Sequence, residues 1–241
     1  MSKIKSIIKD SAGFVYYNTY KKFSSVGNRC LIYHAFGAKL KHDTYGISIN
    51  INKFEEHMRY LHNNYHLTEV NSFSENNLAI SLSIDDGYKD TLEAINVLVK
   101  FKIPFSLFIT TSMIDKSGYL SKQDIIDISK IDYANIGTHG VNHIKLDTMN
   151  YNEQRLELDE SKRILEQITK NDIISTSYPH GSYNNDTLKI MSELGYHWGA
   201  CSKKGFNNKS TDNRLLKRSE IIANDNIISL EKKIKGYYDY Y

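Results

Sequence analysis

Two adjacent carboxylates, Asp85 and Asp86, follow directly on a run of apolar residues and constrain this chain more than any other feature. Residues 78–84 (LAISLSI) are typical of a buried strand, and Gly87 opens a turn toward a following helix. Neighbouring carboxylates repel each other, so the pair is unfavourable unless a cation or a proton divides their roles. The pattern therefore indicates a functional strand end in an α/β protein.

A second polar strand end follows further along the chain. Residues 133–137 predict a strand, and His139 and His143 come just after it, four residues apart. A carboxylate and two imidazoles form a facial ligand set for a divalent metal, with open positions for water and substrate. The spacing alone is weak evidence for a metal site, because His62 and His66 are also four residues apart but straddle a helix end and have no carboxylate partner.

Composition excludes several other classes of protein. The 241 residues have 40% hydrophobic content, 24% charged residues and a net charge of +3, which fits one ordinary globular domain. The sequence has no stripe of basic residues of the kind that indicates nucleic-acid binding. Neither Cys30 nor Cys201 belongs to a CxxC pair, so both are expected to be structural thiols in a reducing compartment.

The first residues of the sequence do not show the pattern of a secretion signal. Lysine and aspartate interrupt each short apolar run of MSKIKSIIKDSAGFVYY, and no stretch is apolar enough to span a membrane. We therefore expect a cytoplasmic protein without a transmembrane segment. Peripheral membrane contact and the oligomeric state stay open.

Strands and helices alternate along most of the chain. The expected strands cover residues 29–36, 78–84, 105–110, 133–137, 173–177, 196–202 and 215–222. The expected helices cover residues 53–63, 89–102, 122–129, 151–169, 185–194 and 229–235. Repeated β–α units imply parallel strands with right-handed crossovers.

The predicted fold is a single α/β domain over residues 1–241, a distorted (β/α) barrel of six to seven mostly parallel strands. Its core covers about residues 29–236, and residues 1–28 form an N-terminal extension. An open doubly wound sheet is the structural alternative, because no glycine-rich phosphate loop decides between the two. In either fold the chemistry belongs at the carboxyl ends of the strands.

Three sequence blocks occur in the order seen in the polysaccharide deacetylase family, carbohydrate esterase family four. They are the strand–Asp–Asp–Gly block at 83–87, the His-x-x-x-His block at 139–143 and Ser-Tyr-Pro-His-Gly at 177–181. The chain resembles this family from roughly Leu31 to Gly236. The resemblance implies a barrel that hydrolyses an N-acetyl group with one divalent metal, usually Zn²⁺, with Co²⁺, Ni²⁺ or Fe²⁺ as alternatives.

Carried over position by position, the resemblance implies a role for each residue of the three blocks. Asp86, His139 and His143 would be the metal ligands, and Asp85 would be the general base. The backbone N–H of His180 would bind the oxyanion of the tetrahedral intermediate, so its side chain is incidental to that role.

The third block also implies substrate contacts. Tyr178, Pro179 and His180 are the expected substrate-binding residues, together with Trp198 on a later strand. For Trp198, packing in the core and a stacking wall for sugar are equally open readings.

The chain departs from the family pattern at two functional positions. Many members have an arginine where Ser177 stands, and Arg218 is the predicted substitute that orients the base. No histidine follows His197, so the late histidine that commonly acts as general acid is missing. Tyr33-His34 resembles the N-terminal block of the permuted poly-N-acetylglucosamine deacetylase branch, which makes His34 the predicted acid.

Other readings of the histidines and of the loop remain. His180 is the functional alternative for the acid, and a core histidine that caps the first strand is the structural alternative for His34. His57 is expected to be exposed. Gly140 stands where the family has serine or threonine, so the loop that carries His143 is expected to be looser.

The predicted function is a metal-dependent deacetylase that removes an N-acetyl group from an amino sugar in a glycan, glycolipid or nucleotide-linked precursor. The apparent lack of a signal peptide favours an intracellular precursor and a role in glycan biosynthesis. A metal amidohydrolase on a non-sugar amide and a catalytically degenerate glycan-binding module are the alternatives. A phosphoesterase is disfavoured, because no second-metal cluster or phosphate loop is evident.

Overall fold

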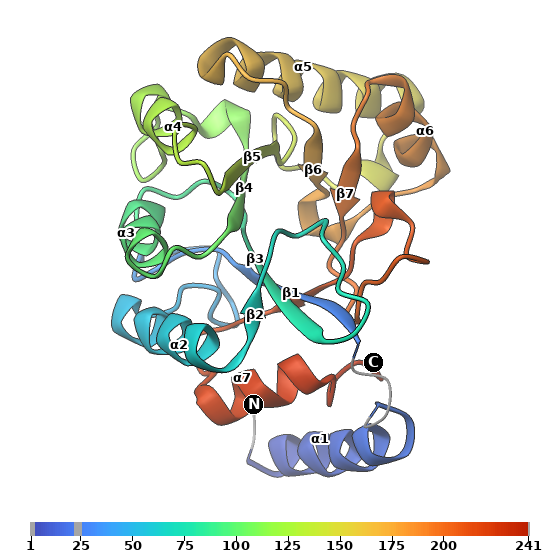
Figure 1. The fold of residues 1–241 in the computed structure, drawn as a ribbon. Coiled ribbons are helices and arrows are strands. Elements are labelled where there is room, and N and C mark those ends of the chain that lie inside the picture. Colours follow the sequence, from blue (N-terminus) through green and yellow to red (C-terminus); the bar gives the residue numbers. More distant parts are fainter. Residues whose placement is uncertain (1–2, 22–25, 241) are drawn as a thin grey trace.

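The computed structural model describes residues 3–21 and 26–240, and its centre is a ring of parallel strands (Figure 1). The strands are β1 (Gly27–Tyr33), β2 (His66–Leu67), β3 (Leu78–Ile84), β4 (Phe105–Ile109), β5 (Ala134–Thr138), β6 (Ser175–Ser177), β7 (Trp198–Ala200) and β8 (Arg218–Glu220). Their spatial order is β7-β6-β5-β4-β3-β1-β8, with the short β2 beside β3.

The two ends of this strand order come close to each other. Every pair of strands in the sheet is parallel. A parallel bridge joins Ala200 at the end of β7 to Leu216 just before β8, which nearly closes the ring. The predicted distorted barrel of six to seven mostly parallel strands is therefore confirmed, and the open-sheet alternative is wrong.

Helices surround the ring. They are α2 (Ile51–Asn64), α3 (Thr91–Phe101), α4 (Lys122–Ile128), α5 (Tyr151–Thr169), α6 (Asn185–Glu193) and α7 (Ile227–Lys235). Helices α2 to α6 connect successive strands, and α7 follows the last strand. Helix α1 (Lys3–Tyr16) continues into a π-helical turn, Tyr17–Lys21, and lies beside α7 outside the ring (Figure 1). The sequence predicted an N-terminal extension at 1–28 but no helix in it.

Local sequence sets where several helices begin and end. Ser121 and Asp124 form a reciprocal capping box at the start of α4, and Asn150 and Glu153 do the same for α5. Helix α3 ends at Lys102, which adopts a left-handed conformation just before the next strand. These caps explain why most predicted helix bounds agree closely with the structure.

The late strands are shorter than predicted. The apolar pattern of residues 173–177 and 215–222 is real, since Ile173 and Ile221 are buried in the core. These side chains lie on loop segments, outside the three-residue strands β6 and β8. Apolar patterning therefore marks burial here without marking a sheet.

The expectation that His57 is exposed is wrong. The side chain lies on the inner face of α2, three residues after the buried Phe54. Its Nδ1 lies 3.3 Å from the Tyr33 hydroxyl and its Nε2 lies 3.1 Å from the Asp225 carbonyl oxygen. Burial lowers the pKa of His57, so the ring is a neutral, hydrogen-bonded part of the core.

Candidate metal centre and active site

The carboxyl ends of the strands surround a cleft of about 380 Å³. Most of the predicted site residues meet there, although they come from distant parts of the chain. The cleft is lined by His34, Asp85, Asp86, His139, His143, Tyr178, His180 and Arg218, with Ile32, His42, Asp43, Tyr45, Ile47, Ser202, Lys204 and Glu220 around them.

The three predicted metal ligands converge on one point of this cleft. Oδ1 of Asp86 lies 3.4 Å from Nε2 of His139 and 3.3 Å from Nε2 of His143. One potential ligand atom from each residue lies within 4.8 Å of the others. The buried Asp86 Oδ1 has no hydrogen-bond partner among the described residues, and coordination to a cation would satisfy it. The residues present therefore fit one divalent metal ion.

The backbone is unusual at this centre. Asp86, His143 and His180 have positive φ angles of 75°, 57° and 58°. Such angles are uncommon for residues other than glycine and are often found at functional sites.

The tautomer of His139 is fixed by a neighbour. Its Nδ1 lies 2.8 Å from the Ser177 carbonyl oxygen, which can only accept a hydrogen bond. The proton therefore lies on Nδ1, and the neutral ring presents the Nε2 lone pair to a metal.

The charges of the ligands support each other. Burial would raise the pKa of Asp86, but the close imidazoles of His139 and His143 hold it well below its usual value. Burial would lower the pKa of His139, but the charges of Asp85 and Asp86 raise it. A proton on His139 and a metal cation therefore compete for the same negative site.

The loop that carries His143 is held by a buried glutamate that sequence reasoning missed. From α5, Glu157 Oε2 accepts hydrogen bonds from the backbone N–H groups of Val141 (2.8 Å) and Asn142 (2.9 Å). Gly140 has φ of +71°, and a Cβ there would lie 3.1 Å from the same oxygen. Glycine thus gives room for this clamp, which ties down the loop where a looser one was expected.

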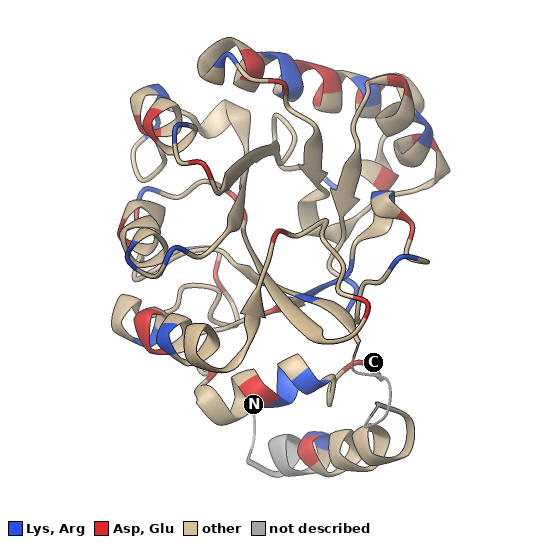
Figure 2. Ribbon diagram, in the orientation of Figure 1, with Lys and Arg blue, Asp and Glu red and all other residues tan. Residues whose placement is uncertain are grey.

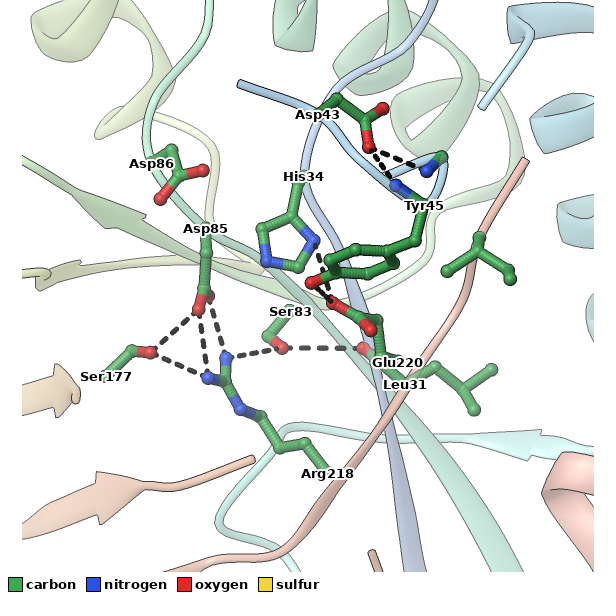
Figure 3. A network of polar contacts seen from close by, with 12 residues as sticks. Leu31, His34, Asp43, Tyr45, Ser83, Asp85, Asp86, Ser177, Arg218 and Glu220 are labelled. Carbon is green, nitrogen blue, oxygen red and sulfur yellow. Dashed lines mark hydrogen bonds and ion pairs between the residues drawn. The ribbon is translucent and has the colours of Figure 1, made fainter. Parts of the chain in front are cut away.

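The second carboxylate of the pair, Asp85, is bound by Arg218 (Figure 3). Arg218 Nη1 donates to Asp85 Oδ1 (2.7 Å) and Nη2 donates to Asp85 Oδ2 (2.9 Å). Ser177 accepts from Arg218 (2.7 Å) and donates to Asp85 (2.8 Å). The arginine predicted as a substitute thus reaches Asp85, and the small Ser177 joins the two.

The charge on Arg218 governs the ionisation of Asp85. Both side chains are almost fully buried. Burial would raise the pKa of Asp85, but the attraction of Arg218 and then of His139 lowers it below its ordinary value. Asp85 is therefore a carboxylate at neutral pH, with Oδ2 3.7 Å from Nε2 of His139.

His34 lies at the end of β1 on another wall of the cleft. Its Nδ1 lies 3.9 Å from Glu220 Oε1, and the Tyr45 hydroxyl donates to that oxygen at 3.2 Å (Figure 3). Sequence reasoning missed Glu220 and Tyr45. The signal for Glu220 was present, since it stands two residues after Arg218 on one strand and so faces the same side.

The third block contributes unevenly to the cleft. His180 lines it, with its ring centroid 4.5 Å from that of His143. Tyr178 lines it too, but its side chain is buried and its hydroxyl donates to the Arg214 carbonyl at 2.6 Å. Pro179 is buried in the turn and is not part of the cleft wall, so a direct substrate contact from it is not supported.

The expected substrate contact from Trp198 is wrong. Trp198 is buried at the start of β7 and packs edge-on against Phe108. It borders a different hollow, together with Phe105 and Ala134 at the starts of β4 and β5. The side chain therefore lies toward the amino ends of the strands, away from the cleft, and core packing is its role.

The fold and the site define a parallel α/β barrel with a candidate metal centre at the carboxyl ends of its strands. The profile of the polysaccharide deacetylase family matches residues 74–199, which include both blocks that build the metal centre. The chain therefore belongs to the polysaccharide deacetylase family.

Comparisons with individual proteins agree with this assignment. YxkH of Bacillus subtilis (strain 168) is 26% identical over 189 residues, which cover 73% of this chain and 64% of that protein. The chain thus spans less than two thirds of the length of this relative. The structure of BA0330 from Bacillus anthracis has a TM-score of 0.77 at 25% identity, covering 86% of this chain and 69% of that one.

Two further solved structures show the same fold. Deacetylase PplD of Streptococcus pyogenes, solved in complex with acetate, has a TM-score of 0.77 at 20% identity, over 88% of this chain and 99% of that one. IcaB from Ammonifex degensii has a TM-score of 0.74 at 17% identity, over 87% of this chain and 97% of that one.

Proposed function

We propose that this protein is a metal-dependent hydrolase that removes the N-acetyl group from an amino sugar in a glycan, glycolipid or nucleotide-linked precursor. Membership of the polysaccharide deacetylase family supports a deacetylase. The observation that carries the proposal is the pairing of a three-residue ligand set with Asp85, a carboxylate kept ionised directly beside it.

Asp86, His139 and His143 would hold one divalent cation, for which zinc is the proposed identity because two imidazoles and a carboxylate suit it. That cation would supply Lewis-acid activation of both the attacking water and the amide carbonyl. The protein fixes the ligand geometry through Ser177 and Glu157, which orient His139 and the His143 loop.

Asp85 is the proposed general base. Its carboxylate lies beside the ligand set, where it can accept a proton from the attacking water. Arg218 donates one hydrogen bond to each oxygen and Ser177 donates a second one to Oδ2, and together they hold the carboxylate in place. A carboxylate oxygen has two lone pairs, so Oδ1, which accepts only one of these hydrogen bonds, keeps a lone pair for a proton from water.

His34 is the proposed general acid. The departing amine must be protonated, because an amide anion is too basic to leave unaided. Glu220 lies 3.9 Å from Nδ1 of His34 and would hold a protonated ring by charge attraction. His180 suits this role less well, because burial and the neighbouring His143 lower its pKa. The backbone N–H of His180 is the proposed oxyanion donor.

Acetate release tests this function directly. The purified protein should release acetate from N-acetylglucosamine oligomers, lose that activity with a chelator and regain it with added Zn²⁺. Comparable or higher activity on a non-sugar N-acetyl amide would favour an amidohydrolase. Binding of the oligomers without acetate release in the presence of metal would indicate a glycan-binding module and would refute the proposal.

A further inference from the structure

Helix α1 presents large apolar side chains away from the rest of the protein. Ile8, Phe14 and Val15 are 63%, 59% and 63% exposed. The opposite face packs closely, since a Cβ added to Gly13 would lie 2.6 Å from the Tyr237 carbonyl oxygen. A helix on the surface of a water-soluble domain normally turns its apolar stripe toward the core. Among the residues of α1 whose burial is described, the arrangement is the reverse.

Specific contacts fix this inverted orientation. Asp10 accepts hydrogen bonds from Lys232 of α7 (2.8 Å) and from the Tyr238 hydroxyl (2.6 Å). Tyr17 stacks on Tyr237 with ring centroids 4.6 Å apart. Asp10 of α1 and Tyr17 of the following turn thus bind the protein, while Ile8, Phe14 and Val15 are left outside.

The charge around this face favours an anionic occupant. The sequence of α1, KIKSIIKDSAGFVY, has three lysines and one aspartate, a net charge of +2. The adjacent helix α7, IISLEKKIK, has three lysines and one glutamate and is also +2. It exposes a further apolar side chain, Ile228 (68%). Figure 2 shows these two helices side by side at one end of the molecule.

The length of α1 decides between spanning a membrane and lying on it. Its 14 residues extend about 21 Å at about 1.5 Å per residue, short of a hydrocarbon core of about 30 Å. Within the described part of the chain, no helix has the length and apolarity that crossing a bilayer requires. Exposed apolar side chains on such a short helix of net positive charge suit the plane of the membrane interface.

We propose that α1 docks on an anionic membrane surface through Ile8, Phe14 and Val15, and that the cleft there acts on a lipid-linked amino sugar. Lys9 of α1 lines a hollow of about 130 Å³ that shares Tyr45, Lys204 and Glu220 with the catalytic cleft. A membrane against α1 would therefore bring lipid headgroups close to the candidate catalytic residues. The substrate half of this proposal rests on the proposed function.

Vesicle co-sedimentation tests the docking step without any reaction. The native protein should bind vesicles of phosphatidylcholine with phosphatidylglycerol, bind less as salt is raised, and bind poorly to phosphatidylcholine alone. The Ile8→Ser/Phe14→Ser/Val15→Ser variant should lose affinity by at least about tenfold. Leu156→Ser is the matched control, because Leu156 is 62% exposed on α5 at the far end of the molecule (Figure 1).

Other results would overturn the docking proposal. They are equal vesicle binding by the triple variant, or no binding of the native protein to either vesicle. A native dimer that the triple variant abolishes, seen by analytical ultracentrifugation, would assign the face to a second copy of the chain. If the triple variant fails to fold by circular dichroism, Val15→Ser alone should still weaken binding.

An activity measurement separates the substrate half from the proposed function. The triple variant should release acetate more slowly than native protein from an N-acetylglucosaminyl lipid in anionic vesicles, and equally fast from a soluble N-acetylglucosamine oligomer. Equal rates for both proteins on the lipid would overturn the substrate half. Vesicle binding without acetate release from either substrate would refute the proposed function and the substrate half, while α1 docking would stand.

Discussion

Replacing Arg218 by methionine should destabilise the protein strongly, because it would leave a buried carboxylate without its cation. Arg218 is 1% exposed and Asp85 is 2% exposed. Besides two bonds to Asp85, the guanidinium donates to Ser83, Ser177 and the Cys201 carbonyl, so the substitution also leaves acceptors unpaired. Removing one partner of a buried ion pair typically costs about 3–5 kcal/mol. We expect a loss in this range in the free energy of unfolding.

Urea unfolding of metal-free protein at pH 7 measures this loss. The double variant Arg218→Met/Asp85→Asn should be less destabilised than Arg218→Met alone, because no unpaired charge remains in it. Arg155→Met is the matched control, since Arg155 pairs with Glu193 at the surface and its loss should cost at most about 1 kcal/mol. A cost below about 1 kcal/mol for Arg218→Met would refute the reasoning.

The pH dependence has a definite sign. The pKa of Asp85 is below 3.8 in the folded protein, so its stabilising effect is complete above about pH 3.8 and is lost as the pH falls through the folded value. Without Arg218, burial should raise this pKa above 3.8, and the ionised carboxylate becomes destabilising. The deficit of Arg218→Met relative to native protein should therefore shrink as the pH is lowered toward 4. A deficit that stays constant with pH would contradict this assignment.

Three further predictions concern the candidate site. Elemental analysis should show that His139→Ala and His143→Ala lose bound metal while the surface variant His62→Ala keeps it, and full occupancy in both site variants would contradict the ligand assignment. The affinity of the native protein for the metal should fall as the pH is lowered, because the raised pKa of His139 favours a competing proton. Asp85→Asn should keep the metal and lose acetate release; loss of metal in this variant but not in Asp86→Asn would reverse the two roles. His34→Ala should slow release from an acetamido sugar by at least about 10²-fold but affect an activated ester much less, and equal losses on both substrates would move the acid role elsewhere.

The sequence predicted the barrel because buried parallel strands leave long apolar runs, and the site followed from polar residues at strand ends. Arg218 could be proposed because the chain lacks an arginine at position 177. The clamp from Glu157 could not be predicted, because it depends on how α5 packs against the loop before His143. Pairings of this kind exist only in the tertiary structure.

Two errors have one physical origin. Apolar patterning shows that a residue is buried, but it does not show whether the side chain lies near the amino or the carboxyl ends of the strands. Trp198 was therefore assigned to the wrong end of the barrel. The same pattern gave no reason to bury His57, whose place depends on the Tyr33 hydroxyl and the Asp225 carbonyl. The compartment of the protein stays a prediction from the sequence.

Titration of metal-free protein with Zn²⁺, with acetate release followed at each addition, tests the central claim most directly. The site formed by Asp86, His139 and His143 predicts no release from an N-acetylglucosamine oligomer without metal and a maximal rate at one bound metal per chain. His139→Ala should stay inactive across the same titration. An unchanged rate in metal-free protein, or one tightly bound zinc per chain with no acetate release, would contradict the account.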